Sequence, residues 1–223
     1  MSLWIKICGN TSLEDALLAA EAGADAVGFV LAPSPRRVTP AQVAAIVPHL
    51  PATLEKIGVF VDAPFEEIDA TVRAAALTGI QLHFDAAPNL PARIRARFGP
   101  ALQILRVIHF GAESAAEAEA IVQDPNVDAV MVDSRTATAV GGTGQSFDWA
   151  LASKTLFQNA KARDRIVAAG GLSPENVAEA IATLRPWGID VVSGVEAAPG
   201  RKDPAKVRAF IANAKAAHRD KVH

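Results

Sequence analysis

The sequence predicts an α/β protein built as a single (β/α)8 TIM barrel. Short apolar segments rich in Val and Ile alternate with longer amphipathic segments, each kind occurs eight times, and the chain has 223 residues. Strands that alternate with helices form parallel sheets, and eight such units favour closure into a barrel, which typically takes about 200–250 residues. An open, doubly wound sheet is the second interpretation of the same pattern.

The eight apolar segments lack strict alternation of apolar and polar residues. Parallel strands that are covered by helices on their outer face and buried on their inner face have this property. The expected strands are Trp4–Cys8, Ala26–Leu31, Lys56–Val61, Ile80–His83, Leu102–Ile108, Ala129–Asp133, Arg165–Ala169 and Ile189–Ser193.

The amphipathic segments between the strands are expected to be helices that cover the barrel. They are Leu13–Ala22, Ala41–Leu50, Phe65–Ala76, Pro91–Phe98, Ser114–Val122, Asp148–Phe157, Glu175–Leu184 and Pro204–Ala217. A capping side chain followed by proline marks three helix starts, at Thr39-Pro40, Ser173-Pro174 and Asp203-Pro204. Thr11 with Glu14 resembles a capping box, and Gly23 and Gly99 are placed to end helices.

Composition limits the classes of protein and partner. Residues 1–217 are expected to form the barrel, and residues 218–223 a charged, frayed tail. The net charge of −2 gives no reason to expect nucleic acid or a membrane as partner. A single cysteine, no signal-peptide pattern and no long apolar run favour a cytoplasmic protein, either monomer or homodimer.

In a barrel of this kind the active site lies where the strands end and the βα loops begin. Glycine-rich turns that can bind phosphate through backbone N–H groups follow strands 6, 7 and 8. They contain Gly142 and Gly144, Gly170 and Gly171, and Ser193 and Gly194. The segment 198–203 leaves room for the short extra helix that often completes such a phosphate site.

Two ionisable residues at strand ends are candidates for acid–base chemistry. Cys8 ends strand 1, where a thiol with a lowered pKa could act as base or nucleophile, although a lone cysteine is often an inert buried residue. Asp133 ends strand 6 after an apolar run, and an apolar setting keeps a carboxyl group protonated and able to act as general acid. A turn or helix-cap aspartate is the alternative.

Other polar residues at the same end are candidates for substrate binding. Arg36 or Arg37 could clamp a carboxylate, or both could be solvated. Gln81 and His83 share one face of strand 4, and Asp190 lies inside strand 8, where it needs a partner. The sequence has no metal-ligand spacing, P-loop, dinucleotide fingerprint or nucleophile elbow.

Taken together, the motifs resemble the phosphoribosylanthranilate isomerase family of tryptophan biosynthesis. The matching stretches include Lys6-Ile7-Cys8-Gly9-Asn10-Thr11, Ser34-Pro35-Arg36, Gln81-Leu82-His83, Val132-Asp133-Ser134, Gly141-Gly142-Thr143-Gly144, Gly170-Gly171-Leu172-Ser173-Pro174-Glu175-Asn176-Val177, Asp190-Val191-Val192-Ser193-Gly194-Val195-Glu196 and Pro199-Gly200-Arg201-Lys202-Asp203. They follow the order of the family over almost the whole chain.

The resemblance implies an Amadori rearrangement of N-(5-phosphoribosyl)anthranilate without metal or organic cofactor. It implies that Cys8 is the general base, Asp133 the general acid and Arg36 the ligand of the anthranilate carboxylate. The glycines at 142, 144, 171 and 194 match phosphate-binding and loop positions. The chain departs from the family pattern at Phe84, where glycine is usual, and at Val192, where serine is usual.

Two other functions remain open at this point. The histidine-pathway isomerase performs the same chemistry on a bulkier bis-phosphate, but an aspartate is expected there at the end of strand 1, where this chain has Cys8. A barrel that only binds a phosphorylated ligand is the second alternative, because a fold does not determine a function. Such a protein would show no turnover, and its ligand affinity would not change in Cys8→Ser.

Overall fold

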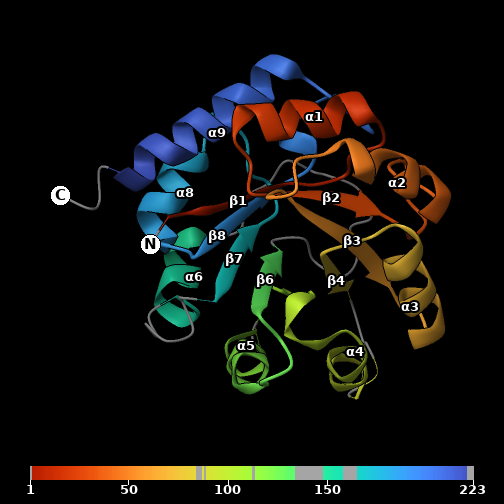
Figure 1. Ribbon diagram of the computed structural model, residues 1–223. Helices are drawn as coiled ribbons and strands as arrows, with labels where there is room; N and C mark the ends of the chain where they lie inside the picture. Colours follow the sequence, from red (N-terminus) through yellow and green to blue (C-terminus); the bar gives the residue numbers. More distant parts are fainter. Residues whose placement is uncertain are drawn as a thin grey trace.

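The chain forms a closed barrel of eight parallel strands in the computed structural model (Figure 1). The structure describes residues 2–83, 87, 89–111, 114–133, 148–157 and 165–219. The strands are β1 Trp4–Ile7, β2 Ala26–Val30, β3 Glu55–Val61, β4 Gly79–His83, β5 Gln103–His109, β6 Ala129–Asp133, β7 Ile166–Ala169 and β8 Gly188–Val191. Each strand pairs with the next, and β8 pairs with β1. The predicted barrel is therefore confirmed and the open sheet excluded.

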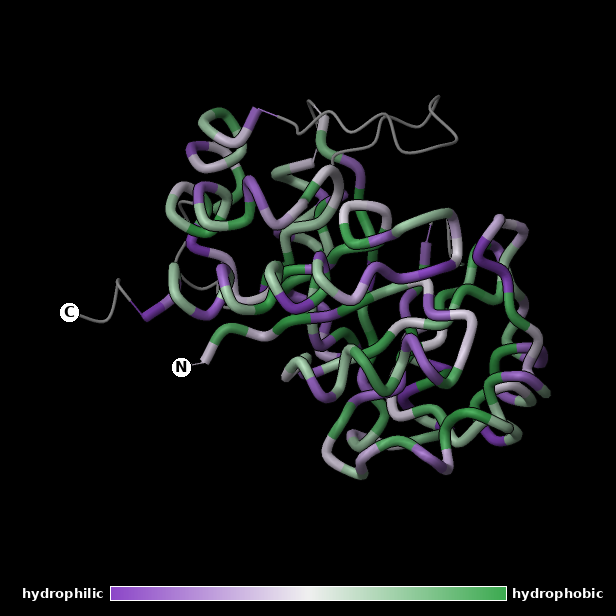
Figure 2. Tube along the Cα trace, turned by 90° about the horizontal axis from the view of Figure 1, so that it is seen from above, coloured by the Kyte–Doolittle hydropathy of each residue, from purple (hydrophilic) through white to green (hydrophobic). Residues whose placement is uncertain are grey.

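Helices alternate with the strands and cover the outside of the barrel (Figure 1). They are α1 Leu13–Ala22, α2 Pro40–Ile46, α3 Phe65–Ala74, α4 Leu90–Phe98, α5 Ser114–Gln123, α6 Trp149–Thr155, α8 Val177–Leu184 and α9 Pro204–Arg219. Figure 2 shows hydrophobic and hydrophilic residues alternating along these peripheral coils, as amphipathic helices require. Within the described part of the chain, no helix is long and apolar enough to cross a membrane.

Apolar residues fill two layers, one on each side of the barrel wall. The outer layer packs strand residues such as Ile5 and Ile7 against the helices. The inner layer lies inside the barrel and includes Trp4, Leu105 and Met131. Because strand side chains alternate between the two faces, the residues two and four positions beyond an inner residue also point inward. The sequence has polar residues at several of these later positions, so their side chains point into the barrel near the C-terminal ends of the strands.

Several details of the helix ends differ from those expected, and three of them have a clear local cause. Helix α2 gives way to a 3-10 turn, Val47–His49, because Pro48 has no N–H to continue the α-helical pattern. Helix α8 begins after Asn176, because Pro174 to Asn176 form a turn instead of its first residues. Helix α1 is capped by Ser12, whose side chain accepts from the Asp15 backbone N–H, and not by Thr11.

Other expected helix ends are confirmed. Thr39 forms a full capping box with Gln42, and the Asp203 side chain accepts from the backbone N–H of Lys206 at the start of α9. Gly23 and Gly99 lie at the C-caps of α1 and α4.

The segment after β8 is a hairpin and does not contain the short helix expected at 198–203. A 3-10 turn, Ser193–Val195, follows β8 directly, and strands β9 Glu196–Ala198 and β10 Arg201–Lys202 pair antiparallel. Helix α9 then runs to Arg219, so the first two residues of the expected tail are helical. Residues 220–223 lie outside the described residues.

Candidate active site

The sequence-predicted site residues that the structure describes lie at the C-terminal ends of the strands or in the turns just beyond them. Cys8 follows β1, Asp133 ends β6, and Gln81 and His83 lie on β4. Arg36 lies in the loop after β2. Gly170 and Gly171 follow β7, Asp190 lies on β8, and Ser193 and Gly194 begin the 3-10 turn after β8. Gly142 and Gly144 lie outside the described residues, as does Phe84.

A chain of polar contacts crosses the inside of the barrel beneath this end. The Lys6 ammonium donates to Asp190 Oδ1 at 2.8 Å and to Gln81 Oε1 at 2.8 Å. Gln81 Nε2 lies 2.8 Å from His83 Nε2. Lys6 is fully buried and the Asp190 side chain is 6% exposed, so both need a charged partner. The contacts connect β1, β4 and β8, and they supply the partner that Asp190 was expected to have.

Cys8 is buried at the end of β1, and its backbone N–H donates to Val191 O at 2.9 Å. Burial raises the pKa of the Cys8 thiol; the Lys6 ammonium acts in the opposite direction, and the Asp190 carboxylate adds to the rise. The expectation of a lowered thiol pKa is therefore wrong. Desolvation of the thiolate outweighs the nearby cation.

The Lys6 pKa is set by the same three groups. Burial disfavours the ammonium ion, but the Asp190 carboxylate and the Cys8 thiolate outweigh this effect and raise the pKa of Lys6. Lys6 therefore stays cationic over the physiological range. A fixed buried cation beside the thiol favours the thiolate whenever the thiol loses its proton.

Asp133 is buried at the end of β6 and shares the inward face of that strand with Met131. Its strand neighbours in register are His109 on β5 and Ala169 on β7. Only β7 and β8 separate β6 from β1, which carries Cys8. A ligand over the barrel mouth can therefore face both a carboxyl group and a thiol from different strands.

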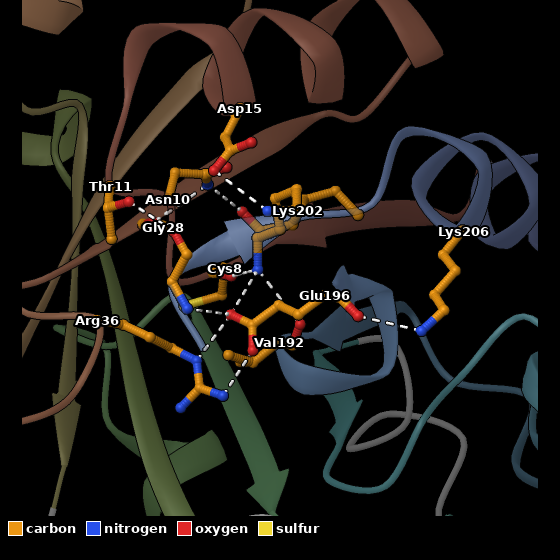
Figure 3. A network of polar contacts seen from close by, with 12 residues as sticks. Cys8, Asn10, Thr11, Asp15, Gly28, Arg36, Val192, Glu196, Lys202 and Lys206 are labelled. Atoms are coloured by element: carbon orange, nitrogen blue, oxygen red, sulfur yellow. Dashed lines mark hydrogen bonds and ion pairs between the residues drawn. The ribbon is translucent and has the colours of Figure 1, made fainter. Parts of the chain in front are cut away.

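Arg36 forms a two-point ion pair with Glu196, shown in Figure 3. Arg36 Nε donates to Glu196 Oε1 at 2.8 Å, and Nη2 donates to Oε2 at 2.6 Å. Burial disfavours the Glu196 carboxylate, but Arg36 and Lys202 outweigh it and lower the pKa of Glu196. Arg37, by contrast, is exposed, and its backbone N–H donates to Ser34 O. The two adjacent arginines thus differ in their surroundings.

The turns after β7 and β8 pack directly on each other. A Cβ atom added to Gly194 would run into the carbonyl group of Leu172, with only 2.9 Å to its carbon. The Asn176 side chain fixes the first turn by donating to Gly171 O at 2.8 Å. Two turns rich in glycine therefore lie side by side, where backbone N–H groups can approach an anion closely.

Three residues of this region were not among the predicted site residues: Lys6, Glu196 and Lys202. Lys6 carries a signal in the sequence, because a charged residue within an apolar strand needs a buried partner. Glu196 and Lys202 carry no such signal, because neither lies in one of the strands expected from the sequence. Within the described ranges, no group of three or more His, Cys, Asp or Glu side chains could hold a metal ion.

Comparison with known proteins gives one consistent result. Residues 5–213 match the family model of N-(5'-phosphoribosyl)anthranilate isomerase. The enzyme of that name from Pelobacter propionicus is 44% identical over 212 residues, which cover 95% of each chain. The crystal structure of the Thermotoga maritima phosphoribosyl anthranilate isomerase is 37% identical with a TM-score of 0.82, and the match covers 96% of this chain and 99% of that one.

A second solved structure of such an isomerase contains a phosphorylated ligand. It is a complex with reduced 1-(o-carboxyphenylamino)-1-deoxyribulose 5-phosphate. That protein is 35% identical to this chain with a TM-score of 0.78, and the match covers 96% of this chain and 99% of that one.

Proposed function

Because this chain belongs to the N-(5'-phosphoribosyl)anthranilate isomerase family, we propose that its barrel performs that isomerisation with Asp133 as general acid and Cys8 as general base. The reaction converts N-(5'-phosphoribosyl)anthranilate to 1-(2-carboxyphenylamino)-1-deoxyribulose 5-phosphate. It is an aldose–ketose isomerisation, an intramolecular oxidation and reduction, in tryptophan biosynthesis. The observation that carries the assignment is the family match over nearly the whole chain.

The first step opens the furanose ring. Protonated Asp133 donates its proton to the ring oxygen as the bond from that oxygen to C1′ breaks, and the nitrogen lone pair forms a Schiff base. The position of Asp133 supports this role, because the residue is buried at the C-terminal end of β6, where a ligand at the barrel mouth can reach it. General acid catalysis of this kind contributes typically about 10²–10⁴-fold.

The second step moves a proton from carbon. The Cys8 thiolate removes the C2′ proton, the electron pair forms the C1′–C2′ double bond, and the iminium nitrogen is neutralised to give an enolamine. The enolamine then tautomerises: C1′ gains a proton while the 2′-hydroxyl loses one, and its electron pair forms the C2′=O bond of the ketone. Lys6 supports this step because its buried ammonium stabilises the thiolate.

Substrate binding at its two ends would hold the reacting carbons between acid and base. We assign the phosphate to the turns with Gly170, Gly171, Ser193 and Gly194, and to Gly142 and Gly144 outside the described residues. We assign the anthranilate carboxylate to Arg36. Gln81, His83 and Asp190 are assigned to the floor of the site, where Gln81 and Asp190 also accept hydrogen bonds from Lys6 and His83 contacts Gln81.

The test is an anthranilate-fluorescence assay with substrate generated in situ. Turnover by the wild type that is lost in both Cys8→Ser and Asp133→Asn supports the acid–base pair. Turnover that survives either substitution near the wild-type rate contradicts the role of that residue. No wild-type turnover, with retained affinity for the phosphorylated ligand, would favour a barrel that only binds.

A further inference from the structure

Glu196 contacts the proposed carboxylate-binding arginine, and Lys202 contacts Glu196 (Figure 3). Glu196 begins β9 and Lys202 ends β10, so the hairpin after β8 supplies both. Their side chains are almost fully buried, at 4% and 0% exposure. Two buried charges outside the proposed acid–base pair need an explanation, because burying them costs free energy that their contacts must offset.

The contacts of Arg36 leave one side of its guanidinium for a ligand. Glu196 accepts from Nε and Nη2, which is one edge of the planar fork. A guanidinium has five N–H donors, so the two on Nη1 and one on Nη2 remain. Among the described residues, no hydrogen bond from Nη1 is present. A carboxylate can therefore bind in two-point fashion at the Nη1–Nη2 end while Glu196 holds the other edge.

Charge decides whether a carboxylate would be attracted to this arginine. Arg36 and Glu196 alone are a neutral pair. Lys202 Nζ lies 3.4 Å from Glu196 Oε1, so the three side chains together carry one positive charge. The cluster is thus arranged to hold the arginine in one orientation without cancelling its attraction for an anion.

Lys202 also reaches the residue proposed as base. Its ammonium donates to Cys8 O at 2.6 Å and to Val192 O at 3.2 Å, and its backbone N–H donates to Asp15 Oδ2 at 3.2 Å. The ends of β1 and β8 are therefore joined to the hairpin through one ammonium group. The backbone of Cys8 and the guanidinium of Arg36 belong to one continuous network of buried contacts.

We propose that Glu196 and Lys202 are positioning residues: Glu196 presents the Nη1–Nη2 end of Arg36 to the substrate carboxylate, and Lys202 supports Glu196 and fixes the Cys8 backbone relative to it. This inference rests on the proposed function. Its specific consequence is that Glu196 acts only through the carboxylate of the ligand. A side chain that merely anchors the hairpin would affect every ligand of the barrel equally.

The experiment compares two ligands by calorimetric titration. One is reduced 1-(o-carboxyphenylamino)-1-deoxyribulose 5-phosphate, and the other is the same compound without the carboxylate. In Glu196→Gln we expect the first ligand to bind about tenfold more weakly, as for loss of a charge-assisted contact, and the second to bind as it does to the wild type. The second ligand also verifies that the variant is folded.

Two further variants sharpen the comparison. Lys206→Met is the matched control, because Lys206 is an exposed lysine that donates to the Glu196 backbone O and not to its carboxylate. It should leave both affinities unchanged. Lys202→Met should reduce the affinity for the carboxylate ligand and also lower kcat, because the Cys8 carbonyl loses its donor.

Each result separates the positioning role from the proposed function. If Arg36→Ala retains the wild-type preference for the carboxylate ligand, the carboxylate assignment to Arg36 fails and the positioning role fails with it. If Arg36→Ala loses that preference but Glu196→Gln keeps it, the assignment stands and the positioning role is overturned. Equal weakening of both ligands in Glu196→Gln would also overturn it, because only an anchoring role predicts that result.

Discussion

Lys6 Nζ lies 2.8 Å from Asp190 Oδ1, in an ion pair that joins β1 to β8 inside the closed barrel. The two residues are direct neighbours in the strand register. Cys8 follows two positions after Lys6 on the same inward face, so the ion pair lies beneath the proposed base. The Cys8 thiol therefore experiences a cation that lowers its pKa, an anion that raises it and a burial effect that outweighs the cation.

This arrangement predicts a shift in the pH profile of Lys6→Met. Only deprotonated Cys8 can act as base, so kcat/KM should rise with pH through the pKa of the thiol in the free enzyme. Removing the ammonium removes the main effect that lowers this pKa and leaves the Asp190 carboxylate, which raises it. The rising limb should therefore move to higher pH in kcat/KM profiles of the variant.

Lys56→Met is the control for this shift. Lys56 is also a buried lysine on a strand, but its ammonium donates to Pro51 O at 2.7 Å, away from Cys8. Its profile should follow that of the wild type. A limb that stays in place or moves to lower pH in Lys6→Met would contradict the electrostatic role of Lys6.

Cys8→Ala should lower kcat strongly with little change in KM. The side chain is proposed to act on C2′ in the transition state and to contribute little to ground-state binding. Loss of a general base costs about 10²–10⁴-fold in rate. Steady-state kinetics by anthranilate fluorescence measures both constants, and near-wild-type turnover would rule out Cys8 as the base.

Arg36→Ala should mainly raise KM. Its guanidinium is proposed to bind the carboxylate equally strongly in the substrate and in the transition state. Loss of such binding raises KM and leaves kcat nearly unchanged. Arg37→Ala is the matched control, because Arg37 is adjacent in sequence but exposed. If only the Arg37 variant shows the higher KM, the carboxylate site has been assigned one residue away from its true position.

Much of the fold could be predicted because each strand is a local apolar run. The position of Cys8 and Asp133 at the mouth followed from one general rule, that βα loops and strand ends carry the site in such barrels. The first helix was placed correctly at Leu13–Ala22, but its cap was assigned to Thr11 instead of Ser12, because Thr11–Glu14 and Ser12–Asp15 have the same local pattern. The Thr11 hydroxyl instead donates to Gly200 O, 189 residues away, and no local pattern contains that contact.

The buried ion pairs could not be predicted for the same reason. Lys6 and Asp190 are 184 residues apart, and Arg36 and Glu196 are 160 residues apart. Both contacts exist only once the barrel closes and the hairpin after β8 packs beside the loops that follow β1 and β2. The predicted direction of the shift in the Cys8 thiol pKa was wrong. The neighbouring lysine, which lowers this pKa, is visible in the sequence, but the desolvation that raises it is a property of the folded interior.

Gly28→Ala should reduce kcat by displacing Cys8. A Cβ atom at position 28 on β2 would lie 2.5 Å from Cys8 Sγ and 3.0 Å from Lys6 Cε, so the thiol must move away from the position at which it is proposed to act as base. Gly58→Ala on β3 is the control, because its Cβ would meet Leu77 Cδ1 at 2.6 Å on the helix-facing side. Kinetics and thermal unfolding of both variants should show a stability loss in Gly58→Ala with kcat retained. In Gly28→Ala, kcat should fall by more than the fraction of unfolded protein can explain. Equal kcat values in the two variants would mean that the position of the thiol is not critical.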